Sequence, residues 1–136
     1  MRSTARLTAF LLAALSALHG AWAFGSSFPF RGRAELADAV VGTPAVPPPS
    51  ACLSVAGALA GAAALIADVV PAPTILRRTA IVGVASALGV RGVLGLVGRT
   101  EALVPGSNSE RFVRLDRQIY APLCLSLSVG CLASLN

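Results

Sequence analysis

Four apolar blocks constrain this chain more than any other feature of its sequence. They lie at about residues 7–24, 51–70, 79–98 and 119–135. A helix needs ~20 apolar residues to cross the core of a bilayer, with a usual range of ~17 to 25. The first three blocks have this length, and the fourth is at the lower limit. Because exposed backbone polar groups cannot face lipid, the blocks predict four transmembrane helices.

The composition excludes an ordinary soluble domain. Hydrophobic residues make up 55% of the 136 residues and charged residues only 12%, whereas a soluble domain typically carries about 25% charged residues. We therefore expect an all-α integral membrane bundle, formed by residues 1–136 as a single domain. Its direct partner is the lipid bilayer.

Segments rich in glycine and proline separate the blocks and predict three connections. A long loop is expected at residues 25–50, a tight hairpin at 71–78 and a medium loop at 99–118. Beside the hairpin, Asp68 is expected to form a local ion pair with Arg77 or Arg78. The order is therefore helix, long loop, helical hairpin, medium loop, helix.

The first block has an alternative interpretation as a secretory signal. Arg2 and Arg6 precede an apolar run that ends in Ala21-Trp22-Ala23, a pattern typical of a cleavage site. However, the run is slightly long for a signal, and cleavage would leave only three spans. We expect an uncleaved first helix, and sequencing the N-terminus of the mature protein distinguishes the two.

The basic residues are all arginines, eleven in number, and the formal net charge is +5. Nucleic-acid binding needs basic residues clustered on one face. These arginines lie mostly between the apolar blocks, near the ends of the expected helices, where membrane proteins usually carry their charged residues. No nucleic-acid partner is therefore expected. Under the positive-inside rule, Arg2 and Arg6 with Arg77 and Arg78 favour a cytoplasmic N-terminus, although a plain count of the other loop arginines opposes it.

Arg91 is the only charged residue well inside an apolar block, ~10 Å below the helix end at ~1.5 Å per residue. Arginine at a helix centre costs about 2.5 to 3.5 kcal/mol on insertion scales, so a partner should offset the cost. Gly83, Ala87, Arg91 and Gly95 recur every four residues, which predicts a small-residue face where a neighbouring helix approaches the guanidinium. The nearest expected counter-charge is Asp116.

The fourth block carries a second stripe. Asp116, Tyr120 and Cys124 recur at four-residue spacing and share one helix face, with Cys131 one heptad further along. This face is expected to point toward Arg91. The cysteines are expected to remain free thiols that pack as small apolar residues.

The segment before the fourth block is predicted to form a short interfacial helix. Ser107 and Glu110 have the spacing of a capping box, and Phe112 and Leu115 begin an apolar stripe. Because a proline inside a helix removes a hydrogen bond, we expect this helix to bend near Pro122 as it enters the span.

The predicted topology brings six residues to one side of the membrane, and these form the candidate site. They are His19, Trp22, Arg91, Asp116, Tyr120 and Cys124. The alternative interpretation of Arg91 is a structural residue, either in a salt bridge or with its side chain reaching toward the membrane interface. His19, beside Trp22, has the alternative role of an anchor at that interface. One histidine and a distant thiol are too few ligands for a metal, so neither metal nor cofactor is expected.

Several of these residues also form a recognisable pattern. The pattern comprises His19-x-x-Trp22-Ala23-x-Gly25, Arg91 in the third span, and Phe112-x-x-Leu115-Asp116-x-x-x-Tyr120-x-Pro122-Leu123-Cys124. It resembles a bacterial family of small four-helix membrane proteins known only as the domain of unknown function numbered three-nine-nine-five. The chain departs from it at Ala121, where such proteins tend to have serine, and at residues 99–102, where they tend to have aromatic residues.

The resemblance implies four spans, an uncleaved first helix and location in the bacterial inner membrane, but no activity. From the residues, we expect a non-enzymatic protein that acts through helix packing with a second copy or with a membrane-protein partner. The alternative is a small transporter or intramembrane enzyme that binds an anionic or lipid-derived ligand near Arg91. Thiol redox chemistry at Cys124 is less favoured, because no C-x-x-C partner is present.

Overall fold

The computed structural model describes residues 2–136 and contains helices but no strand in that range. The long helices are α1 (Arg2–Ala23), α3 (Pro49–Ile66), α4 (Thr74–Leu96) and α6 (Ala121–Ala133). The shorter ones are α2 (Arg33–Leu36) and α5 (Glu110–Leu115), the π-helical turns η1 (Ala37–Val41) and η3 (Asp116–Tyr120), and the 3₁₀ turn η2 (Thr100–Ala102). The predicted long and medium loops therefore contain short helices.

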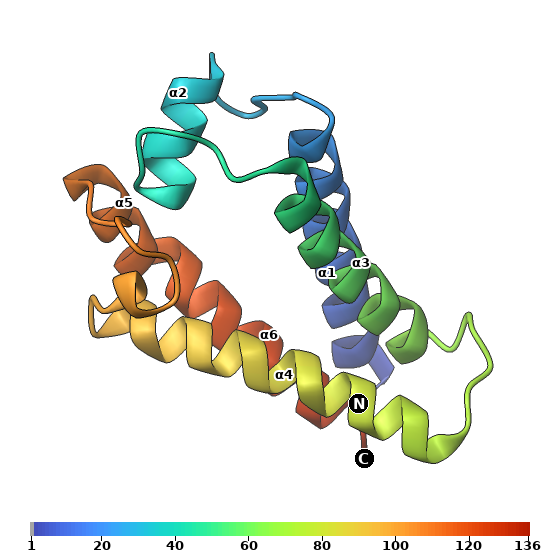
Figure 1. The fold of residues 1–136 in the computed structure, drawn as a ribbon. Coiled ribbons are helices and arrows are strands. Elements are labelled where there is room, and N and C mark those ends of the chain that lie inside the picture. Colours follow the sequence, from blue (N-terminus) through green and yellow to red (C-terminus); the bar gives the residue numbers. More distant parts are fainter. Residues whose placement is uncertain (1) are drawn as a thin grey trace.

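The long helices form two pairs that together resemble a V (Figure 1). α1 packs along α3, and α4 packs along α6. The pairs meet near the two chain termini, which we call the narrow end, and diverge toward α2 and α5, which we call the wide end. Leu12, Leu59, Ile81 and Leu127, one from each long helix, share a buried core where the pairs meet.

Glycines set the close approach of α4 and α6. A Cβ added at Gly92 would lie 2.6 Å from Cγ of Leu125, and one at Gly89 would lie 3.2 Å from Oγ of Ser128. The predicted stripe was therefore only partly correct, since Gly83 and Ala87 are exposed. A strict four-residue repeat drifts by about 40° per step on a helix of 3.6 residues per turn, so its first members leave the face that its last member shares.

The C-terminal helices α5, η3 and α6 follow one another without a break over residues 110–133. The wide turn η3 ends just before Pro122, which has no backbone N–H and whose ring would clash with the carbonyl four residues earlier in a regular helix. A π-turn at this position is a common way to relieve such a clash. The predicted capping box was wrong: the N-cap is Ser109, whose hydroxyl accepts a hydrogen bond from the N–H of Phe112 at 3.2 Å.

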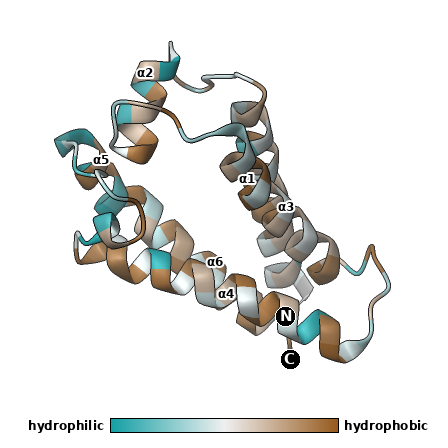
Figure 2. Ribbon diagram, viewed as in Figure 1, coloured by the Kyte–Doolittle hydropathy of each residue, from teal (hydrophilic) through white to brown (hydrophobic). Residues whose placement is uncertain are grey.

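Three helices are long and apolar enough to cross a membrane: residues Ser3–Ala23, Pro49–Ile66 and Thr74–Leu96. Hydrophobic residues dominate the long helices, whereas hydrophilic ones gather at α2 and α5 (Figure 2). Large apolar side chains such as Phe10, Val90 and Val129 are exposed on the long helices.

The predicted helical hairpin is not formed, because α3 and α4 diverge into different helix pairs after the connection at residues 67–73 (Figure 1). α4 begins at Thr74 and already includes Arg77 and Arg78. The local ion pair predicted there is confirmed: Nη1 of Arg77 lies 2.9 Å from Oδ1 of Asp68. Arg77 also donates to the carbonyl of Leu65 near the end of α3.

Candidate functional site

The ion pair that the sequence predicted between Arg91 and Asp116 is present. Nη2 of Arg91 donates to Oδ1 of Asp116 at 2.8 Å, and Oγ1 of Thr100 donates to Oδ2 at 2.5 Å. The Asp116 side chain is only 2% exposed. Both carboxylate oxygens therefore have a donor, as a buried charge needs if its desolvation is to be offset.

Gly95 makes room for this pair. A Cβ at this position would lie 2.8 Å from Nη1 of Arg91 and 2.9 Å from Oδ1 of Asp116. Gly95 is the member of the predicted stripe that does face the guanidinium. Thr100 was missed, because its contact with Asp116 joins two turns sixteen residues apart and leaves no local pattern.

The guanidinium of Arg91 is otherwise sparsely bonded. Its Nη1 is buried and has no hydrogen-bond partner in the part of the chain that the structure describes. Its Cζ lies 6.0 Å from the centre of the Phe112 ring, at the outer limit of a cation–π contact. Arg91, Asp116 and Thr100 thus form a compact unit, the ion-pair site, that ties α4 to the C-terminal helix.

Three hydroxyls from the C-terminal half hold the turn η1 in place. Oη of Tyr120 donates to the carbonyl of Ala39 at 2.9 Å, Oγ of Ser107 to that of Val41 at 2.6 Å, and Oγ of Ser109 to that of Asp38 at 3.0 Å. We call this set the η1 clamp. It joins the wide end of one helix pair to the wide end of the other.

The η1 clamp also explains why a glycine ends this turn. Gly42 has a φ of 75°, and a Cβ there would lie 2.6 Å from the Phe112 ring. Its carbonyl accepts hydrogen bonds from the N–H groups of Asn108 and Ser109. The sequence marked residues 25–50 only as a loop, so the clamp was not foreseen.

His19 and Trp22 lie together near the end of α1, with ring centres 4.9 Å apart. Nε1 of Trp22 donates to the carbonyl of Phe28 at 2.7 Å, and Nδ1 of His19 lies 2.8 Å from the carbonyl of Leu15. A carbonyl only accepts, so Nδ1 carries the proton, and in the neutral ring Nε2 is left as an acceptor.

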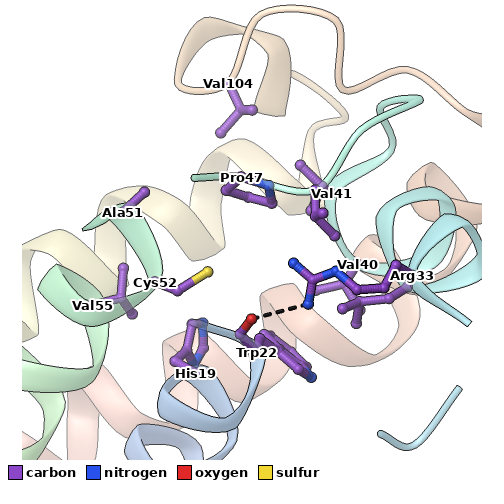
Figure 3. Close-up of a pocket in the computed structure, with 12 residues that line it drawn as sticks. His19, Trp22, Arg33, Val40, Val41, Pro47, Ala51, Cys52, Val55 and Val104 are labelled. Atoms are coloured by element: carbon purple, nitrogen blue, oxygen red, sulfur yellow. Dashed lines mark hydrogen bonds between the residues drawn. The ribbon is translucent and has the colours of Figure 1, made fainter. Parts of the chain in front are cut away.

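These two residues line a cavity of about 330 Å³ at the wide end (Figure 3). The cavity lies between the end of α1, the start of α3 and the segment α2–η1, with one residue from the loop after η2. The lining residues are His19, Trp22, Arg33, Leu36, Val40, Val41, Val46, Pro47, Ala51, Cys52, Val55 and Val104. Most of them are apolar, so the cavity suits an apolar molecule better than a polar one.

The six candidate residues therefore fall into two places. His19 and Trp22 line the cavity, whereas Arg91, Asp116, Tyr120 and Cys124 do not. The turn η1 stands between the two places, because Val40 and Val41 line the cavity while the carbonyl of Ala39 accepts the Tyr120 hydroxyl. The sequence could not foresee this separation, since η1 belongs to the segment that was taken as a loop.

Arg33 is a cavity residue that the sequence did not single out. Its Nη1 donates to the carbonyls of Trp22 and Ser26, at 3.0 and 3.1 Å. The carbonyl of Trp22 belongs to the last turn of α1, where a cation also interacts favourably with the helix dipole, and that of Ser26 lies three residues beyond the helix end. The only available signal was its place between the first block and the prolines, which does not distinguish it from Arg31.

A second ion pair joins α2 to α5 at the wide end. Oε1 of Glu35 lies 3.2 Å from Nη2 of Arg111, and Oε2 accepts the N–H of Arg31 at 3.1 Å. This backbone hydrogen bond, more than the Arg111 guanidinium, lowers the pKa of Glu35 below its usual value of 4.5. The guanidinium of Arg111 also lies over the Phe30 ring, 5.7 Å from its centre.

Cys52, Cys124 and Cys131 are free thiols. Within residues 2–136, no three or more His, Cys, Asp or Glu side chains come close enough to hold a metal ion.

Comparison with known proteins identifies a family only. A family model described as a protein of unknown function (DUF3995) matches residues 12–131. No curated protein and no solved structure matches the chain.

Proposed function

The chain belongs to the DUF3995 family, and we propose that it is a four-span membrane protein that binds a small, largely apolar molecule in the cavity at its wide end. The activity is binding without catalysis. The observation that carries this proposal is the cavity of about 330 Å³, lined mainly by residues of α1, α3 and the segment α2–η1 between them.

Four spans are proposed although, within residues 2–136, three helices qualify by themselves. The turn η3 and α6 together cover residues 116–133, which is long enough to cross most of a bilayer core at ~1.5 Å per residue. In this arrangement α2 and α5, with their many charges, lie at the membrane interface. We place the protein in the bacterial inner membrane with both termini in the cytoplasm, on the side of Arg6, Arg77 and Arg78.

Binding is favoured at the cavity and not beside Arg91. Both oxygens of Asp116 and one nitrogen of Arg91 are already engaged within the ion-pair site. A ligand for Asp116 or for Nη2 of Arg91 would have to break a buried pair, which leaves an uncompensated charge, and the remaining Nη1 is itself buried. The cavity, in contrast, has the size and apolar lining of small-molecule sites, which usually measure ~300 to 1,000 Å³.

Trp22 supplies a direct test, because it is the only tryptophan of the chain and lines the cavity. ω-Bromoundecanol, whose bromine quenches indole fluorescence on contact, is titrated into the protein in nanodiscs of zwitterionic lipid. We expect saturable quenching in the wild type and little saturable quenching in Val40→Phe, which fills the cavity. Val129→Phe, the same change at a lipid-exposed site, serves as the control. Linear quenching without saturation in the wild type would refute the proposal.

A second candidate function, association with another copy of the chain, is favoured by one face of α3. Gly57 and Gly61 are exposed, and a Cβ at either would meet nothing within 4 Å. Such pairs of small residues four apart allow two membrane helices to approach closely. Energy transfer between labelled copies in liposomes should fall in Gly57→Leu and persist in Gly83→Leu, a matched change on α4. Equal transfer in both variants would reject this interface.

A further inference from the structure

The polar part of the cavity lies at one end, where Arg33 meets the end of α1. Figure 3 shows the Arg33 guanidinium beside the backbone of Trp22, across the cavity from the apolar side chains of α3. His19 and the Cys52 thiol are the other ionisable side chains that line the cavity. The cavity thus combines an apolar body with one cationic corner.

The charge of Arg33 has no carboxylate partner among the residues that the structure describes. The ion pairs there are Arg77 with Asp68, Arg91 with Asp116, and Arg111 with Glu35. Glu35, two residues away on the same helix, is bonded to Arg111 and to the N–H of Arg31. Both hydrogen bonds of Arg33 start from Nη1, so the other guanidinium donors stay available.

Arg33 is partly buried, and an anion is the partner that best stabilises a cation where it is removed from water. Carbonyl acceptors offset part of the desolvation cost but leave the net charge. An anionic group that enters the cavity would take the free guanidinium donors in charge-assisted hydrogen bonds, which are about twice as strong as neutral ones. Nδ1 of His19 already donates to the carbonyl of Leu15, so we assign the anionic group to Arg33.

The volume of the cavity and its depth in the membrane restrict the class of ligand further. The volume of about 330 Å³ is at the lower end of the range for small-molecule sites, too small for a phospholipid with two chains. Trp22 and the end of α1 belong at the depth of the lipid headgroups, where tryptophan collects. A molecule that enters from the membrane would therefore hold its head at Arg33 and its chain among the valines.

We propose that the cavity selects a single-chain amphipathic anion, such as a fatty carboxylate, whose head group binds Arg33. This inference rests on the proposed function and names the ligand class of the same cavity. The competing explanation is that Arg33 only caps the C-terminal end of α1. The two differ in whether the cavity discriminates ligands by charge.

The test compares three probes that differ only in the head group: ω-bromoundecanoate, ω-bromoundecanol and ω-bromoundecyltrimethylammonium. Quenching of Trp22 is measured in nanodiscs at about pH 9, where the carboxylate is ionised, and at equal mole fraction of probe in the lipid. We expect the carboxylate to bind about tenfold tighter than the alcohol, as one charge-assisted hydrogen bond predicts, and the cation to bind weakest.

The variants Arg33→Gln and Arg33→Lys then test whether the preference for the carboxylate probe depends on the Arg33 side chain. Arg33→Gln should lose the preference for the carboxylate over the alcohol, whereas Arg33→Lys should keep part of it. Wild-type protein that binds all three probes equally would overturn the inference and leave the proposed function intact, whether or not the variants fold. A preference that persists in Arg33→Gln would overturn it too. Saturable quenching by none of the probes would instead refute the proposed function.

Discussion

Nη2 of Arg91 lies 2.8 Å from Oδ1 of Asp116, across the seam between α4 and the C-terminal helix. The carboxylate is buried, while the arginine side chain keeps 25% of its exposure. The geometry favours a structural role, because the Thr100 hydroxyl occupies the second oxygen of the Asp116 carboxylate and the pair lies outside the cavity. Its contribution should therefore appear in stability, with ligand binding unchanged.

Breaking the pair from one side should be costly. Asp116→Asn leaves Arg91 with a buried charge and should lower the free energy of unfolding by about 3 kcal/mol, at the low end for buried pairs because Arg91 is partly exposed. Arg91→Gln should cost a similar amount. Steric trapping in bicelles measures both. The double variant should lose clearly less than the sum of the two, whereas additive losses would show that the residues act independently.

Gly95 should not tolerate a methyl group. In Gly95→Ala the new Cβ would lie within 3 Å of Ala121 Cβ, Arg91 Nη1 and Asp116 Oδ1. Overpacking of this kind typically costs about 1 to 3 kcal/mol. Gly83→Ala is the matched control, because a Cβ there meets nothing within 4 Å and alanine favours the helix. Equal stability of the two variants would contradict the packing described for this seam.

The contribution of the η1 clamp to stability can be measured apart from that of the aromatic packing around it. Tyr120→Phe removes the hydroxyl that donates to Ala39 but keeps the ring, whose centre lies 6.3 Å from that of Phe112. We expect a loss of about 1 kcal/mol, the usual net value of one hydrogen bond. Hydrogen exchange should accelerate at residues 37–42 and stay unchanged in α4. Uniform acceleration over the whole chain would mean that Tyr120 supports the fold more generally.

Acid should loosen the link between α2 and α5. The pKa of Glu35 is lowered in the folded protein, first by the N–H of Arg31 and then by Arg111. A lowered folded pKa gives stability that is present above the unfolded value and is lost as pH falls through the folded value, below 4.5. NMR titration of the Glu35 carboxyl should show this pKa. Glu35→Gln should abolish the acid-induced change at α2, and a change that remains would have another origin.

Local sequence patterns predicted the parts of this fold that follow a single rule. Runs of apolar residues gave the three membrane-length helices, because length and hydropathy suffice to define them. The Arg91–Asp116 pair was predictable too, since a charge inside an apolar helix needs a partner and few candidates exist. Gly95 followed from the same reasoning.

Contacts between distant segments were not predictable in this way. Ser107 matched a capping box but donates to Val41, sixty-six residues earlier. The face of α4 that packs against α6 is defined by Gly89 and Gly92, whose partners lie on another helix. The cavity depends on α2 and η1, whose short length gives no clear periodicity, so Arg33 could not be assigned to it.

The measurement that tests the central claim most directly is photolabelling with an alkanol that carries a diazirine, followed by mass spectrometry of the labelled residues. In native membranes, we expect labelling that excess decanol competes away to fall on cavity residues such as Val40, Cys52 and Val55. Labelling of the exposed Phe10 and Val129 should occur without competition, as contact with bulk lipid predicts. Labelling that is not competed anywhere, or that is competed equally at Val129 and in the cavity, would contradict a ligand site at the wide end of α1 and α3.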